Sequence, residues 1–218
     1  MFSNSNMLRI KPTSGRIPFL VLLSATGFAH AGTINVDINR SNTPNYSGVG
    51  VAPDTGTVWN SLVAPTAASF TQNNLSDSAG NSTASAVTIT RNNGQTIKTW
   101  DDATAGNPNP ADLMREYLYQ GPYTVTLTNL APGAYKFYVF AHGNNTGQNS
   151  TITLDAANGG ASGTTIDSGS YRDILQPGAA GSTYLALGGT VGAAGYFTFT
   201  TSSHLNGFQL YQHTVDPA

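Results

Sequence analysis

The chain has 218 residues, of which 39% are hydrophobic and 9% are charged, and its formal net charge is −2 at pH 7. The few charged residues are scattered and form no basic stripe, so nucleic acid and anionic membranes are poor partners on composition. Cysteine is absent, which excludes disulfide bonds and a thiol nucleophile.

The first 31 residues carry the pattern of a secretory signal peptide. Basic residues precede a short apolar run, Ile17–Leu23, and the stretch Ala29-His30-Ala31 supplies a cleavage motif. The run is too short for a transmembrane helix, which needs about 20 apolar residues. We therefore expect export through the secretory pathway, to the extracellular space or the cell envelope.

The mature chain is expected to hold a single domain over residues 32–213, followed by a tail at 214–218. Cleavage after residue 31 would remove three of the nine basic residues and none of the eleven acidic ones, which leaves a net charge of −5. A chain of this length can bury a core without disulfide bonds. No transmembrane segment is expected in the mature chain.

Alternation of apolar and polar residues over short stretches predicts an all-β fold. The alternating stretches are Ile34–Ile38, Val87–Thr90, Val125–Thr128, Ile152–Leu154, Leu185–Leu187 and Phe197–Phe199. A period of two is typical of antiparallel strands with one buried face, and clusters of Gly, Asn and Pro separate these stretches. We expect a two-sheet antiparallel β-sandwich of the jelly-roll type.

Two further elements are predicted in the middle of the chain. Tyr123–Thr128 and Ala134–Phe140 flank Pro132-Gly133, a typical turn pair, so we expect a hairpin. The second of these strands is aromatic on both faces and is expected to be central and covered on both sides. Pro110 and the apolar residues that follow it recur at helical spacing, which predicts one short α-helix over 110–119.

Four stretches in this order resemble a known family: Ile34–Ile38, Ala52–Asn60, Leu113–Leu118 and Leu205–Leu210. Together they are similar to secreted bacterial proteins with a galactose-binding-like jelly roll, many of which carry a PEP-CTERM sorting tail. No such tail is present in this chain. The resemblance implies a jelly-roll fold, and domains of this kind often bind sugars in carbohydrate-active enzymes.

Sugar recognition requires exposed rings beside amide or charged side chains, because the apolar side of a sugar stacks on a ring while its hydroxyls form hydrogen bonds. The candidate ligand-binding residues are Tyr46, Trp59, His142, Asn144, Asn145, Tyr171, Arg172 and Asp173. The run Tyr171–Asp173 is favoured, since it places an aromatic ring and two opposite charges in an otherwise featureless stretch. Further candidate rings are Trp100, Tyr119 and Tyr123.

A structural calcium ion is the metal hypothesis that the sequence permits. Asp37 and Asn39 lie on one face of a predicted strand, and Asp54 lies in a loop. Oxygen ligands of this kind suit Ca²⁺. The alternative is that these side chains form turn hydrogen bonds. No pair of histidines has the spacing of a zinc motif.

The sequence favours a non-catalytic binding module, with an extracellular glycan or cell-surface polymer as its partner. One alternative is a structural or adhesive envelope protein without a small ligand. Another is a polysaccharide-acting enzyme that uses Asp101 with Asp102, Glu116 with Asp173, or Tyr171 or His142 as a base. No residue is assigned a catalytic role, and Glu116 is expected to be solvated.

Overall fold

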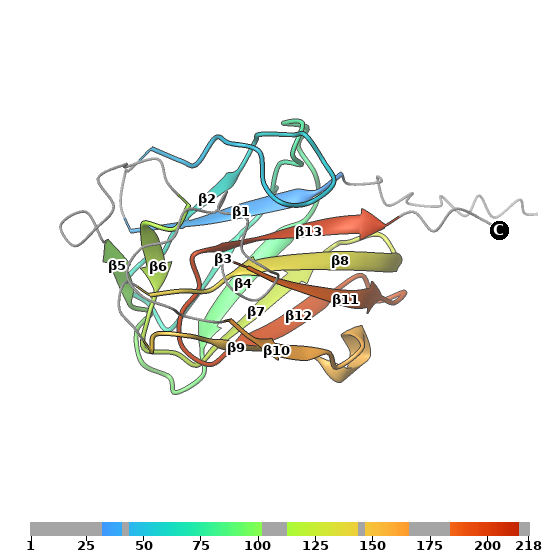
Figure 1. The fold of residues 1–218 in the computed structure, drawn as a ribbon. Helices are drawn as coiled ribbons and strands as arrows, with labels where there is room; N and C mark the ends of the chain where they lie inside the picture. Colours follow the sequence, from blue (N-terminus) through green and yellow to red (C-terminus); the bar gives the residue numbers. More distant parts are fainter. Residues whose placement is uncertain (1–31, 41–43, 102–112, 144–146, 166–183, 214–218) are drawn as a thin grey trace, which may run out of the picture.

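Two β-sheets packed face to face form the body of the molecule (Figure 1). The computed structural model describes residues 32–40, 44–101, 113–143, 147–165 and 184–213. The strands are β1 (Ile34–Asn39), β2 (Asn60–Val63), β3 (Ser69–Gln72), β4 (Ala86–Arg91), β5 (Thr99–Asp101), β6 (Glu116–Leu118), β7 (Tyr123–Thr128), β8 (Gly133–Phe140), β9 (Thr151–Leu154), β10 (Ser162–Thr164), β11 (Leu185–Val191), β12 (Phe197–Thr201) and β13 (Gly207–His213). A 3-10 helix, η1, covers Ala156–Asn158.

The five-stranded sheet, here sheet A, has the order β11-β8-β13-β1-β2, and the six-stranded sheet B has the order β10-β9-β12-β7-β4-β3. The pairs are antiparallel except for β1 with β2, which run parallel. Strands β5 and β6 form a separate ribbon at one end of the sandwich, while β13 ends at the opposite end (Figure 1). The predicted all-β, two-sheet sandwich is therefore confirmed.

Phenylalanine rings from both sheets meet in the middle of the core. Phe137 of sheet A lies 4.5 Å from Phe199 of sheet B, measured between ring centroids, and Phe208 lies 5.5 Å from Phe199. All three side chains are fully buried. Burial of aromatic area of this size is the main favourable term in holding two sheets together.

The predicted hairpin between residues 123 and 140 is wrong. Strand β7 pairs with β4 and β12 in sheet B, whereas β8 pairs with β11 and β13 in sheet A. The connection crosses from one sheet to the other because Leu130 is buried in the core, and its N–H donates to the carbonyl of Gly195. The prediction that β8 is central is correct, but its outer face is only partly covered, since Lys136 is exposed.

The α-helix predicted over 110–119 is also wrong in its described part. Residues 113–115 form a turn, and Glu116–Leu118 form β6. The backbone of Leu118 exchanges two hydrogen bonds with Leu205, at 2.9 and 3.2 Å, so its polar groups are satisfied across strands. The apolar spacing that indicated a helix instead directs Leu113 and Met114 into a second buried cluster. None of the described residues belongs to a helix long and apolar enough to cross a membrane.

Candidate functional site

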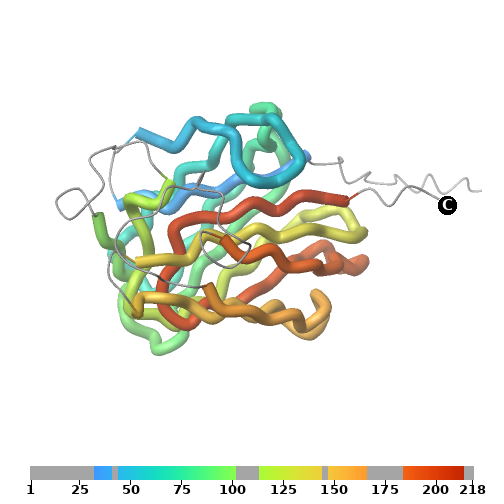
Figure 2. The backbone as a smooth tube through the Cα atoms, in the orientation of Figure 1, coloured from blue at the N-terminus to red at the C-terminus, as the bar shows by residue number. Residues whose placement is uncertain are grey.

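A long loop covers half of the outer face of sheet A. Residues 44–59, called the strap below, run beside β1 (Figure 2). Gln209 of β13 holds the strap, because its Oε1 accepts hydrogen bonds from the backbone N–H groups of Val51 and Ala52 at 2.6 and 3.0 Å. Its Nε2 donates to Asn35 Oδ1 at 2.8 Å. A Cβ at Gly50 would lie 2.1 Å from the Gln209 amide, so a larger residue here would push this side chain away from its hydrogen bonds.

Tyr46 and Trp59 belong to the packing of the strap. Trp59 is 5% exposed, and its indole N–H donates to the carbonyl of Gly48 at 2.9 Å. The Tyr46 ring meets Trp59 edge to face at 5.1 Å, and Phe140 lies beneath at 6.4 Å. Trp59 was a candidate sugar platform, but its ring is closed off by its own structural contacts.

The three candidate calcium ligands do not form one group. Asn39 Nδ2 donates to Asp37 Oδ2, and that same oxygen accepts the backbone N–H of Tyr46 at 2.9 Å. Asp54 has a separate environment, where its carboxylate accepts hydrogen bonds from Ser78 Oγ at 2.6 Å and from the N–H of Gly56 at 2.8 Å. Within the described residues, no group of three or more acidic or histidine side chains is arranged to hold a metal ion.

The pKa of Asp54 reflects these contacts. Burial opposes ionisation of this carboxyl, but the hydrogen bonds from Ser78, Thr33 and Gly56 together favour the charged form more strongly, so its pKa lies below the ordinary value. The side chain therefore acts as a hydrogen-bond acceptor that ties the strap to the segment around Ser78.

His142 lies two residues after the end of β8 and is 4% exposed. Its backbone N–H donates to the side-chain oxygen of Asn206 at 2.8 Å, and Asn206 Nδ2 donates to the carbonyl of Met114 at 3.1 Å. Asn206 is completely buried and joins the end of β8 to the turn before β6. No local pattern in the sequence indicates Asn206, because its partners lie 64 and 92 residues away along the chain.

Glu116 of β6 and Asp101 of β5 both have structural partners. Glu116 is 3% exposed, and its Oε2 accepts the backbone N–H of Arg40 at 2.6 Å, so its expected role as an exposed charge is wrong. Asp101 forms a two-point ion pair with Arg115, at 2.7 and 3.2 Å. Its proposed catalytic partner Asp102 lies outside the described residues.

Five of the candidate ligand residues also lie outside the described residues: Asn144, Asn145, Tyr171, Arg172 and Asp173. They stay predictions. Of the further candidate rings, Tyr123 is fully buried, whereas Trp100 is 43% exposed and meets Tyr119 edge to face at 6.0 Å.

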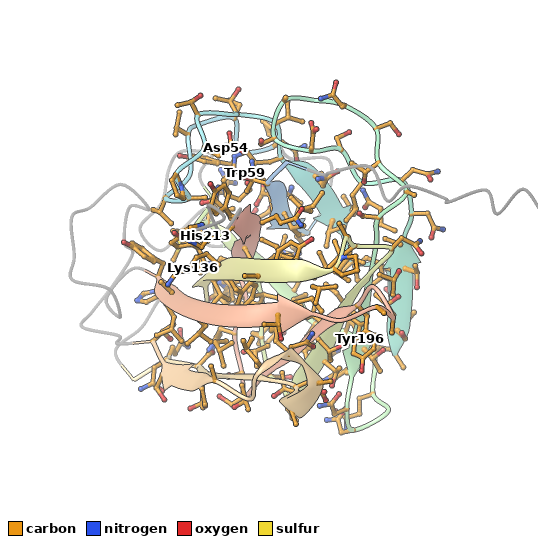
Figure 3. The ribbon with its side chains drawn as sticks, turned by 90° about the vertical axis from the view of Figure 1, so that its right-hand side faces the viewer. Asp54, Trp59, Lys136, Tyr196 and His213 are labelled. Carbon is orange, nitrogen blue, oxygen red and sulfur yellow. The ribbon has the colours of Figure 1, made fainter. Side chains whose placement is uncertain are left out.

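The half of sheet A that the strap leaves uncovered carries an aromatic surface that the sequence did not indicate. Tyr138 of β8, Tyr184 just before β11 and Tyr211 of β13 are all half-buried there, and Tyr138 and Tyr184 lie 6.1 Å apart. The exposed residues Lys136 and His213 lie on the same outer side of β8 and β13 (Figure 3). We call these five residues the tyrosine face.

The three tyrosines are close enough to influence one another. Burial raises the pKa of the Tyr138 hydroxyl, and the neighbouring Tyr184 and Tyr211 hydroxyls raise it further. Tyr138 therefore stays neutral at physiological pH, and its hydroxyl offers both a donor and an acceptor beside an apolar ring. This combination is suited to a ligand with alternating apolar and hydroxyl surfaces.

The outer face of sheet B has a different chemistry. The strand register aligns six hydroxyl side chains across all six strands: Ser69, Thr90, Thr124, Thr200, Thr153 and Ser162. A shallow depression of about 270 Å³ lies over β9 and β12, lined in part by Thr198 and Asp155. The half-buried Tyr196 lies on the same face, two residues before Thr198, away from Lys136 and His213 (Figure 3). This face lacks the clustered rings of sheet A.

Comparisons with known proteins place the chain in no family. No protein-family model matches the sequence, and no curated protein matches it. One similar solved structure is a variant of the exo-β-1,3-galactanase from Phanerochaete chrysosporium with bound β-1,3-galactotriose, at 15% sequence identity and a TM-score of 0.27. The match covers 63% of this chain and 32% of the galactanase chain. A similarity at this level decides neither the fold nor the activity.

The strap should depend on Gln209. In Gln209→Ala, the N–H groups of Val51 and Ala52 lose their acceptor, and we expect unfolding to become easier by about 2–4 kcal/mol, because each unpaired buried group costs about 1–3 kcal/mol. Urea unfolding followed by tryptophan fluorescence measures this. Gln212→Ala on the same strand is the control, since its Nε2 reaches the carbonyl of Pro132 only at 3.5 Å. Equal losses in the two variants would contradict the anchoring role.

The lowered pKa of Asp54 makes a prediction about pH. A carboxyl whose pKa is depressed in the folded state stabilises the fold above its unfolded value of about 3.9, and this stabilisation disappears as the pH falls through the folded value. We therefore expect Asp54→Asn to be less stable than the unmodified protein at pH 6, and the difference to shrink below about pH 4. Thermal unfolding across this range measures the difference. A gap that stays constant with pH would show that ionisation of Asp54 is not involved.

Proposed function

We propose that this protein is an exported, non-catalytic carbohydrate-binding module whose ligand surface is the tyrosine face of sheet A. The observation that carries the proposal is the position of three tyrosines on one open face. Tyr138 belongs to β8, Tyr211 to the neighbouring strand β13, and Tyr184 lies just before β11, the neighbour of β8 on the other side. Rings in such a row can stack on successive sugars of a chain. Export is proposed from the N-terminal pattern of basic, apolar and small residues.

Polar groups for hydroxyl recognition accompany the rings. Lys136 supplies an ammonium donor, His213 supplies ring nitrogens, and each tyrosine adds a phenol. The described backbone beneath them consists of β8 between β11 and β13, so the rings stand on a rigid part of the sheet. A site on paired strands needs little reorganisation on binding, which favours affinity.

The same arrangement favours binding over catalysis. The five residues of the tyrosine face include no carboxylate, whereas hydrolysis of a glycosidic bond typically uses two. Among the described residues, Asp37 and Glu116 are buried, and Asp101 is held by Arg115. A catalytic pair would therefore have to come from elsewhere, and the proposal assigns none.

Tyr138 is the central ring and gives the sharpest test. We expect the unmodified protein to bind at least one soluble polysaccharide in a panel of neutral and acidic glycans, and Tyr138→Ala to bind about tenfold more weakly, since loss of a stacking ring removes about 1.4 kcal/mol. Affinity electrophoresis finds the ligand, and titration calorimetry measures the change.

Tyr196→Ala is the matched control, because Tyr196 is also half-buried on an outer sheet face but belongs to sheet B. Its affinity should equal that of the unmodified protein. Unchanged binding in Tyr138→Ala with weakened binding in Tyr196→Ala would move the site to sheet B. Absence of binding to every glycan in the panel would overturn the proposal and favour a structural or adhesive role.

A further inference from the structure

Lys136 is an exposed cation in the middle of the tyrosine face. Its cross-strand neighbours are Tyr211 on β13 and Gly188 on β11. It forms no ion pair with any described residue. An exposed ammonium that the described residues leave unpaired is available to a ligand, and it would meet an anion as a compact point charge.

Within the described residues, the acidic side chains are engaged elsewhere. Asp37 and Glu116 are buried and accept backbone N–H groups, and Asp101 is paired with Arg115. Asp54, within the strap, is hydrogen-bonded to Ser78, and Asp155 lines the depression on sheet B. The elements around Lys136 present tyrosine, histidine, glutamine and small residues, so the described part of this face is positive in a chain whose net charge is negative.

Space for a ligand group lies directly beside the ammonium. A Cβ built at Gly188 would meet no atom of the described residues within 4 Å, and the outward neighbours of Gly188 along β11 are the small residues Ala186 and Thr190, both exposed. The rings of β8 and β13 stand on the other side of Lys136. The side chains are therefore small over β11 and large over β8 and β13, where the tyrosines lie, and Lys136 lies between these two regions.

We propose that the ligand of the tyrosine face is an acidic polysaccharide, in which a uronate carboxylate or a sulfate ester binds Lys136 while the sugar rings stack on Tyr138 and Tyr211. The inference rests on the proposed function, because the rings supply the stacking. Charge complementarity selects the anionic class: the hydroxyls of a neutral glycan offer the ammonium only uncharged acceptors, whereas an anion accepts a hydrogen bond and also balances the charge.

The test compares matched polymers on the intact protein. Polygalacturonate is set against the same polymer after chemical reduction of its carboxyl groups, and a sulfated galactan is set against its desulfated form. We expect the acidic member of at least one pair to bind about three- to tenfold more tightly, and this preference to fall as salt is raised. The pair that shows the preference identifies the anion as carboxylate or sulfate.

Lys136→Gln should remove the preference and its salt dependence, so that the acidic and neutral polymers bind this variant equally. Lys98→Gln is the matched control, since Lys98 is another exposed lysine and lies just before β5, at the opposite end of the sandwich from the end of β13. Both variants change the net charge equally, so an equal loss in Lys98→Gln would assign the effect to overall charge and overturn the proposal. Melting temperatures check that both variants are folded.

The outcomes separate this inference from the proposed function. Binding that depends on Tyr138 but is equal for acidic and neutral polymers would overturn the acidic assignment and leave the module intact. A preference for the acidic polymer that survives Lys136→Gln would also overturn it. Absence of binding to all four polymers would overturn the acidic assignment and exclude these polymers as ligands. The proposed function itself would be overturned only if the protein bound none of the glycans in the wider panel.

Discussion

The close approach of β13 to β1 at Gly207 is the constraint on which the rest of sheet A depends. A Cβ at this position would lie 2.4 Å from the carbonyl oxygen of Val36 and 2.8 Å from Leu113. Only glycine allows β13 to lie between β1 and β8 in this register. Once Gly207 is fixed, the alternation of side chains places Gln209, Tyr211 and His213 on the outer face in turn. The outer side chains of β13 then differ in what covers them.

The outer face of β13 changes along its length from closed to open. Leu113 covers Gly207, the strap covers Gln209, and Tyr211 and His213 remain accessible. The polar residues under the strap are satisfied by its backbone, since Asp37 accepts the N–H of Tyr46. Access to the tyrosine face follows from the same arrangement, because the strap meets β8 at Phe140 and leaves Lys136 exposed and Tyr138 half-buried. The strap and the tyrosine face thus occupy neighbouring parts of one sheet face.

The sequence predicts the local geometry of this molecule but not the partners of its strands. The alternation in β7 and β12 matches their observed burial, because one buried face imposes a period of two. The turn-like residues before Gly133 predict a reversal of the chain, but they cannot tell a hairpin from a crossing between sheets. The apolar spacing of Leu113–Leu118 fits one helical turn as well as a turn followed by a short strand, and the cross-strand bonds with Leu205 decide between them.

The site shows the same division between local and long-range information. Alternation alone places Lys136 and Tyr138 on one face of β8. Tyr211 joins them only because β13, about 70 residues later, pairs with β8 in a particular register. Trp59, by contrast, has the composition of a platform but is buried by a loop whose path depends on Gln209. Ring type therefore indicates a sugar site less reliably than the side of the sheet on which the ring lies.

Net charge is a poor guide to the surface of this protein, because many of its carboxylates have structural partners. Asp77 accepts the N–H groups of Ala79 and Asn81, and Glu116 accepts the N–H of Arg40. Carboxylates buried in this way contribute little to the potential outside, since their charge is balanced by backbone dipoles at short range. The exposed charges then decide which ligands are attracted. A chain that is acidic by composition can for this reason present a cationic, aromatic face, and the exclusion of anionic partners that composition suggests does not extend to that face.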